Sequence, residues 1–175
     1  MAERCVNAYD QRLKEKLGPI NWQFMATKKF DPDDFGKFLK LLPKTVDGQT
    51  IRHAVEVRHD SFRHPDFISL ARENGVAVIT AGDSEYPQIA DITAPFVYAR
   101  IMGTQESEAT GFSDKALKIW AERARAWSEG KVADGLSAVS PITASTPVKD
   151  VFLYVISGFK ERNPAAAMKL MEFVG

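Results

Sequence analysis

Charged residues alternate with apolar ones inside a segment that otherwise has the composition of a buried β-strand, and this alternation restricts the folds open to the chain. In HAVEVR (53–58), Glu56 and Arg58 fall on one face of the predicted strand, while Val55 and Val57 fall on the other. An exposed antiparallel strand would show the same alternation. The neighbouring segments therefore decide where the polar face points.

The same division into a polar and an apolar face occurs in two more predicted strands. Asn21 and Gln23 lie opposite Trp22, and Tyr98 and Arg100 lie opposite apolar neighbours. The five predicted strands cover residues 18–25, 54–58, 76–81, 95–103 and 150–158.

Predicted helices alternate with these strands, and their ends carry residues that commonly start or stop a helix. Asp31, Ser113 and Asn163 are predicted N-caps, and Gly75 and Gly130 are predicted helix ends. The predicted helices cover residues 5–17, 31–43, 60–75, 113–130 and 163–175.

This alternation predicts a parallel sheet with right-handed crossovers, covered by helices. An open sheet of that kind is apolar on both faces, which does not fit the polar faces found here. A barrel accounts for them, because its outer face meets helices while polar side chains pair in its lumen. We therefore predict one α/β domain over residues 1–175, a partial TIM-type (β/α) barrel with about five parallel strands, where a complete barrel has about eight.

Composition and charge exclude several classes of partner. The 23 basic and 23 acidic residues give a formal net charge of zero, which does not favour a nucleic-acid partner. No apolar run approaches the roughly 20 residues of a membrane-spanning helix. The single cysteine, Cys5, excludes an internal disulfide and fits a reducing compartment. We predict a cytoplasmic protein with no nucleic-acid partner, no membrane partner and no cofactor.

Six segments carry a family resemblance when they are taken in order: LGPINWQFM, FDPDDFGKFLKLLP, HAVEVRHDSF, VAVITAGDSEYP, FVYARIMG and DVFLYVISGFKERNPAAAMKL. Together they resemble the YecE-like family of bacterial proteins, domain of unknown function 72, in its alphaproteobacterial branch. The resemblance implies a longer (β/α)₈-type barrel whose fourth to eighth strands correspond to those predicted here, so that the N-terminal third is absent. It implies no particular reaction.

The chain departs from other branches of that family in places that matter for a site. Residues 100–103 read Arg-Ile-Met-Gly where those branches carry Arg-Leu-His-Gly, so no histidine role is carried over. Ser157 and Gly158 replace an Asn-Asn pair. Asp83 matches the aspartate that the resemblance places after the sixth strand, with Gly82 before it.

The candidate site residues follow the C-terminal ends of the predicted strands, where (β/α) barrels hold their sites. They are Gln23, Glu56, Arg58, His59, Asp83, Arg100 and Lys160. Two arginines beside two carboxylates suit a small anionic ligand, because guanidinium binds carboxylate and phosphate through a planar pair of donors. Glu56 or Asp83 would act as a general base. Lys160 lies beside the start of the last predicted helix, a position that favours anions.

Structural explanations for the same residues stay open. Glu56, Arg58 and Arg100 would also form a charge network that fixes the interior, and Asp83 would also cap a turn. Glu56, His59 and Asp83 include metal-ligand types, but the sequence has no HxH, HExxH or cysteine cluster. We therefore predict no metal site.

Two functional hypotheses follow. The first is a YecE-like barrel protein that binds a small phosphate- or carboxylate-bearing ligand, with the question of enzymatic activity left open. The alternative is a truncated, catalytically inactive fragment or binding module. Such a fragment would self-associate, or a partner chain would complete it, through its open sheet edges.

Overall fold

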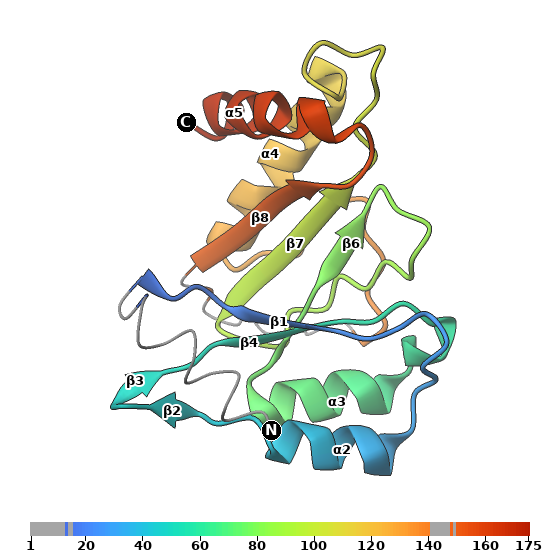
Figure 1. The fold of residues 1–175 in the computed structure, drawn as a ribbon, viewed down its shortest axis with the longest axis vertical. Helices are drawn as coiled ribbons and strands as arrows, with labels where there is room; N and C mark the ends of the chain where they lie inside the picture. Colours follow the sequence, from blue (N-terminus) through green and yellow to red (C-terminus); the bar gives the residue numbers. More distant parts are fainter. Residues whose placement is uncertain (1–12, 14–15, 141–147, 149) are drawn as a thin grey trace.

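The computed structural model describes residue 13 and residues 16–140, 148 and 150–175. The helix predicted over residues 5–17 lies mostly outside the described residues, and Cys5 lies wholly outside them. Two parallel three-stranded sheets form the centre of the molecule, and helices cover the outer side of each (Figure 1).

The first of these, the β4 sheet, has the strand order β1-β4-β5. Its strands are β1 (Ile20–Gln23), β4 (His53–Glu56) and β5 (Ala77–Val78). The second, the β7 sheet, has the order β6-β7-β8, with β6 (Thr80–Gly82), β7 (Phe96–Met102) and β8 (Asp150–Ile156). A short antiparallel hairpin, β2 (Thr45–Val46) and β3 (Gln49–Thr50), precedes β4.

The prediction of a TIM-type (β/α) barrel is wrong. The described residues form three small sheets, two parallel and one antiparallel, and no sheet among them closes on itself. The predicted strand over residues 76–81 is split into β5 and β6, which belong to different sheets. The polar faces of the strands are real, but they lie between two sheets.

A side chain from a later segment explains the split. Thr93 Oγ1 accepts a hydrogen bond from Val78 N at 2.9 Å and donates one to Val76 O at 2.7 Å. On the other edge of the segment, Ile79 N donates to Val55 O at 2.9 Å. The backbone groups of β5 are therefore satisfied by β4 and by Thr93. Pairing with β7 starts only at β6, where Thr80 is in register with Ala99.

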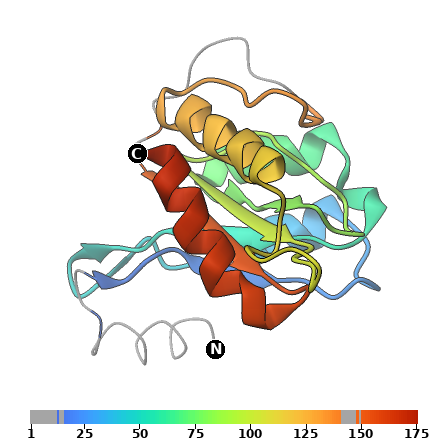
Figure 2. The same cartoon turned by 90° about the horizontal axis from the view of Figure 1, so that it is seen from above.

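The helices cover the sheets in two pairs. The helices α2 (Pro32–Lys40) and α3 (Pro65–Asn74) lie below β1 and β4 in Figure 1. The helices α4 (Asp114–Ser128) and α5 (Asn163–Val174) lie over the strands of the β7 sheet (Figure 2). We call the β4 sheet with α2 and α3 the β4 half, and the β7 sheet with α4 and α5 the β7 half.

Each half has its own apolar core. The β4 half packs phenylalanines, including the fully buried Phe67, against the apolar face of β4. The β7 half packs Trp120 and Trp127 of α4 against β7. A smaller cluster lies between the sheets and includes Ala54, Tyr98 and partly buried Phe152. The strand alternation thus directs one face of each sheet to helices and the other to the opposite sheet.

Two of the three predicted helix caps are confirmed. Asp31 Oδ1 accepts from Asp34 N at 2.8 Å, and Ser113 Oγ accepts from Ala116 N at 3.3 Å. Asn163 is not a cap of this kind, because its Oδ1 accepts from Thr104 Oγ1 at 2.7 Å and α5 begins without a side-chain cap. Gly75 ends α3 with a φ of 64°, a left-handed conformation that glycine adopts without strain.

In the described part of the chain, no helix combines the length and the hydropathy that crossing a bilayer requires.

Candidate functional site

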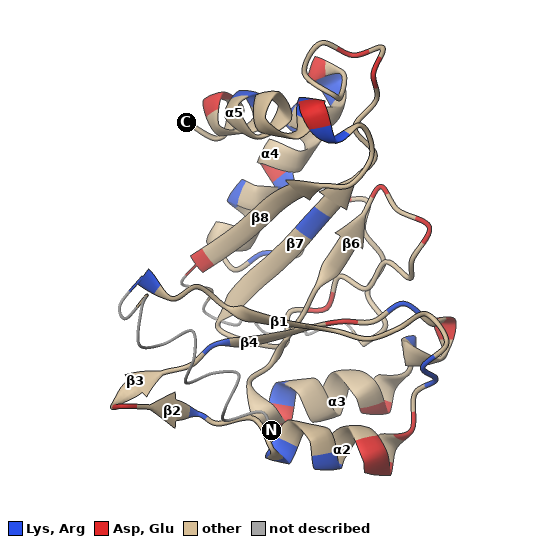
Figure 3. Ribbon diagram, viewed as in Figure 1, with Lys and Arg blue, Asp and Glu red and all other residues tan. Residues whose placement is uncertain are grey.

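Gln23, Glu56, Arg58 and Arg100 meet between the two sheets, and we call these four residues the arginine cluster. Arg100 is the one basic residue within β7, visible as the blue segment of that strand in Figure 3. The other three come from the β4 half, at the ends of β1 and β4. Strand alternation places Arg100 on the face that looks toward the β4 sheet.

One carboxylate holds both guanidinium groups. Arg58 Nε donates to Glu56 Oε1 at 2.9 Å, and Arg58 Nη2 lies 2.8 Å from the same oxygen. Arg100 Nη1 donates to the second oxygen, Glu56 Oε2. Each carboxylate oxygen therefore accepts from a different arginine, an arrangement of charge-assisted hydrogen bonds that fixes all three side chains.

The amide of Gln23 is the second acceptor in the cluster. Its Oε1 accepts from Arg58 Nη2 at 2.9 Å and from Arg100 Nη1 at 3.2 Å. Gln23 and Glu56 are register partners in the parallel pair of β1 and β4, which explains why both reach the same arginines. The cluster is thus built from two register neighbours on one sheet and one residue of the other.

Burial differs sharply within the cluster. The Glu56 side chain is fully buried, whereas the side chains of Arg58 and Arg100 keep 22% and 18% of their exposure. Burial lowers the pKa of Arg100, but a guanidinium starts far above neutrality and stays charged at neutral pH. Two positive charges face one negative charge, so the cluster carries a net charge of about +1 at its solvent side.

A model of a known protein family matches the given sequence from its first residue to its last. The model of the family described as "Protein of unknown function DUF72" matches residues 1–175. The chain belongs to the DUF72 family. No curated protein matches it.

Solved structures of two DUF72 proteins have a similar fold. A DUF72 family protein from Thermotoga maritima is 16% identical with a TM-score of 0.62, and the match covers 97% of this chain and 63% of that one. A DUF72 family protein from Enterococcus faecalis is 14% identical with a TM-score of 0.61, and the match covers 99% and 66%. The present chain therefore spans less than two thirds of either structure.

Aromatic rings border the arginine cluster in this DUF72 protein. The guanidinium carbon of Arg58 lies 4.3 Å from the centroid of the Tyr86 ring, within cation–π distance. Tyr154 of β8 is the register partner of Arg100 and lies on the same face. The sequence reasoning missed both tyrosines as site residues. The period-two pattern of residues 150–156 holds the signal for Tyr154, whereas Tyr86 follows a turn and has none.

Asp83 is not part of the arginine cluster. It follows β6 with a φ of 51°, and its Oδ2 accepts from Trp120 Nε1 of α4 at 2.8 Å. Gly82 makes this approach possible, since a Cβ there would lie 2.3 Å from the Trp120 ring. The structure therefore places Asp83 against Trp120 of α4 and outside the hydrogen bonds of the arginine cluster.

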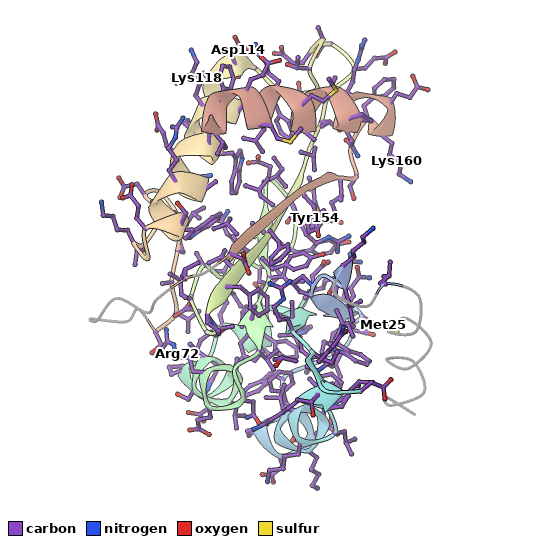
Figure 4. The ribbon with its side chains drawn as sticks, turned by 90° about the vertical axis from the view of Figure 1, so that its left-hand side faces the viewer. Met25, Arg72, Asp114, Lys118, Tyr154 and Lys160 are labelled. Atoms are coloured by element: carbon purple, nitrogen blue, oxygen red, sulfur yellow. The ribbon has the colours of Figure 1, made fainter. Side chains whose placement is uncertain are left out.

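His59 and Lys160 also lie apart from the hydrogen bonds of the cluster. His59 Nδ1 accepts from Ser61 N at 3.1 Å, so the ring caps η2 (Asp60–Phe62). Lys160, exposed at the start of η3 (Lys160–Arg162), points away from the ribbon in Figure 4. The candidate residues thus divide into four that meet and three that do not.

A buried histidine was not among the candidates. His53 Nδ1 accepts from Trp22 Nε1 at 3.1 Å, and His53 Nε2 lies 2.8 Å from Pro43 O. These partners require the neutral ring with its proton on Nε2. Burial lowers the pKa of His53, while the Pro43 carbonyl opposes the shift. Within the residues that the structure describes, no group of three or more His, Cys, Asp and Glu side chains is placed to hold a metal ion.

Proposed function

We propose that this DUF72 protein binds a small anionic molecule, bearing a carboxylate or a phosphate, at the arginine cluster. The observation that carries the proposal is the charge imbalance: two part-exposed guanidinium groups share one buried carboxylate. A network that served packing alone would gain most from complete neutralisation, since uncompensated charge is costly near a protein interior. An anion at the solvent side would supply the missing charge.

The hydrogen bonds inside the cluster leave donors for such a ligand. They use Nε and Nη2 of Arg58 and Nη1 of Arg100. Arg58 Nη1 and Arg100 Nε and Nη2 make no hydrogen bond to the described residues. Guanidinium groups that are held in place bind an anion at a lower entropic cost than free ones, because their rotamers are already fixed.

The geometry supports binding better than proton transfer by Glu56. Both carboxylate oxygens of Glu56 already accept from guanidinium groups, and the side chain has no exposure. A general base has to reach the proton that it abstracts. Asp83, the other proposed base, is held by Trp120 at a distance from the cluster. We therefore propose Glu56 as the residue that orients the two arginines.

The test is the affinity of the 175-residue chain for inorganic phosphate and for acetate, measured by calorimetry. Arg58→Gln and Arg100→Gln should each weaken binding roughly 10- to 100-fold, the effect of losing a hydrogen bond to a charged group. Arg63→Gln is the matched control, because among the described residues the Arg63 side chain forms an exposed ion pair with Asp60, away from the arginine cluster.

A third variant separates this proposal from a purely structural role. Glu56→Gln keeps the shape of the side chain and raises the charge of the cluster, so it should tighten anion binding. If the wild type binds neither anion, or if the variants that stay folded bind as the wild type does, the proposal fails. Unfolding of both arginine variants, in place of a loss of binding, would mean that the cluster is a structural clamp.

We propose as a second candidate that the open strand edges pair with a further polypeptide segment. In the described residues, β1 pairs only with β4 and β8 pairs only with β7, so each has one free edge. The Tyr154 side chain next to the β8 edge is 42% exposed. Free parallel edges are templates for another strand. Sedimentation across a dilution series tests this: self-association supports it, and a monomer at every concentration counts against it.

We also propose a branch of the DUF72 family and a cellular compartment for this protein. The six segments quoted above support the YecE-like branch of DUF72, and the single cysteine supports a reducing compartment such as the cytoplasm.

A further inference from the structure

An aromatic surface continues from the arginine cluster along β7 and β8. Tyr98, two residues before Arg100, is in register with Phe152, and Arg100 is in register with Tyr154. The rings of Tyr98 and Tyr154 have centroids 5.1 Å apart at an angle of 31°, and Tyr98 and Phe152 are stacked at 6.5 Å. Figure 4 shows Tyr154 on the β8 side, where the two halves meet.

This surface is buried at one end and open at the other. Tyr98 is 8% exposed, whereas Tyr154 is 42% exposed. The exposed ring of Tyr154 offers a wide and rigid contact area beside the charged groups, at a small entropic cost. The open end is the one that adjoins Arg100, so a ring lying on Tyr154 would be next to the guanidinium groups.

The side-chain oxygen of Asn21, on the facing β4 sheet, is a buried hydrogen-bond acceptor without a donor in the described part of the chain. Asn21 Oδ1 is buried and has no hydrogen-bond partner among the described residues. Asn21 shares the polar face of β1 with Gln23, and its register partner Ala54 packs in the same cluster as Tyr98. Buried amide oxygens are nearly always paired, so a donor that entered between the sheets would gain a hydrogen bond at this atom.

The phenol of Tyr98 is a stable donor at the inner end of the surface. Burial, together with the neighbouring Tyr154, raises its pKa to about 12. The group therefore keeps its proton throughout the physiological range. Neither Tyr98 nor Tyr154 has a hydrogen bond from its hydroxyl to the described residues, so both hydroxyls are free to donate to a ligand or to water.

We propose that the anion bound by the arginine cluster is a flat-ring acid: an aromatic ring that carries a carboxylate, together with an N–H or O–H group. The acid pairs with Arg58 and Arg100, the ring lies on Tyr154, and the donor enters between the sheets to bond with the buried Asn21 Oδ1. This inference rests on the proposed anion-binding function and narrows it from any small anion to one class.

The experiment compares three carboxylates that resemble the proposed ligand to an increasing degree: acetate, cyclohexanecarboxylate and benzoate. All three carry one carboxylate, and the last two have six-membered rings of similar size, so only benzoate offers a π-face. Calorimetry on the 175-residue chain should show benzoate binding roughly fivefold more tightly than cyclohexanecarboxylate, as expected for one favourable ring pair. Tyr154→Ala should remove that advantage, and Met171→Ala, at an exposed position on α5, should preserve it.

The donor is tested separately with the three hydroxybenzoate isomers. One of them should bind more tightly than benzoate, and Asn21→Leu should abolish that gain without weakening benzoate itself. If no isomer gains, or if the gain survives in Asn21→Leu, the role of Asn21 is wrong.

The outcomes separate this inference from the proposal on which it rests. If acetate, cyclohexanecarboxylate and benzoate bind equally, and Arg58→Gln weakens all three, the cluster binds anions and the flat-ring inference is overturned. If none of the probes binds, the anion-binding function itself fails. A benzoate preference that survives Tyr154→Ala would also overturn the inference, because the ring would then lie elsewhere.

Discussion

The β4 half and the β7 half are stabilised in different ways. The strands of the β4 half run for two to four residues, and its core contains phenylalanine rings with centroids 5.1–6.1 Å apart. In the β7 half, β7 and β8 pair over seven residues, and Trp120 and Trp127 of α4 fill the core. Short strands contribute few backbone hydrogen bonds, so the β4 half depends more on side-chain packing.

The arginine cluster lies where these two kinds of structure meet. Its acceptors and Arg58 come from the packing-dependent half, and Arg100 comes from the strand-paired half. A site built across such a junction changes whenever the halves shift relative to each other. Substitutions that weaken one half alone should therefore reveal how tightly the two are coupled.

The largest expected effect is from Phe67→Ala in the β4 half. Phe67 is fully buried and contacts the rings of Phe35 and Phe62 at centroid distances of 5.1 Å. Truncation should lower the free energy of unfolding by about 3–5 kcal/mol. Urea unfolding measures the loss, and hydrogen exchange should show the β4 half losing protection before the β7 half.

Met171→Ala provides the exposed control for this variant. It should change the free energy of unfolding by less than about 0.5 kcal/mol. Equal loss of protection in both halves of Phe67→Ala would show that they unfold as one unit and would remove the distinction between them.

A smaller effect is expected from Gly82→Ala in the β7 half. The new Cβ would lie 2.3 Å from two atoms of the Trp120 ring, which the hydrogen bond to Asp83 holds in place. The clash should cost about 1–3 kcal/mol and shift the tryptophan fluorescence. Thermal unfolding and emission spectra measure both quantities.

Gly36→Ala in the β4 half is the matched substitution, and it should raise the free energy of unfolding where Gly82→Ala lowers it. Gly36 lies inside α2, and a Cβ there would have only ordinary contact, 3.9 Å from Leu70. Alanine should stabilise the helix by about 0.5–1 kcal/mol. A neutral Gly82→Ala would mean that Trp120 moves freely and that the β7 half is less rigid than its long strand pair suggests.

The last expected effect requires no substitution and is a pH dependence that originates in the β4 half. His53 is buried as the neutral ring, with its pKa below the ordinary value of 6.5. The unfolded chain binds a proton at pH values where the folded chain does not, so stability falls as the pH falls below about 6.5. The loss is at most about 1.4 kcal/mol for each pH unit, down to the folded pKa.

Unfolding of the wild type and of His53→Gln at pH 7.5 and at pH 5.5 measures this contribution. The wild type should lose more stability between the two pH values than the variant does. An identical loss in both proteins would assign the pH dependence to other groups.

Structural elements that depend on residues close together in the chain were predicted well from the sequence. The helices α2, α4 and α5 lie within the predicted ranges, and Asp31 and Ser113 cap α2 and α4 as expected. The alternation in residues 53–58 correctly placed Glu56 and Arg58 away from the apolar core. These features depend on residues a few positions apart, which a single sequence contains in full.

The candidate site was only partly predictable. Side-chain alternation placed four residues on the polar faces of their strands, and the structure shows that they do meet: Gln23, Glu56, Arg58 and Arg100. Asp83 was chosen by the same rule, but its left-handed φ turns the side chain to Trp120. In a turn, the direction of a side chain depends on the partner that it contacts. Here that partner is Trp120, which is 37 positions away along the chain.

By itself, the sequence determined which faces of the strands are polar and where α2 and α4 begin, because side-chain periodicity and capping act within a few residues. Only the tertiary structure decided that the strands divide into two sheets. That division depends on Thr93 bonding to the backbone of Val76 and Val78, about 15 residues earlier, and on Arg100 reaching Glu56 across 44 positions. Contacts at such separations leave no periodic pattern, so they follow from packing and not from local order.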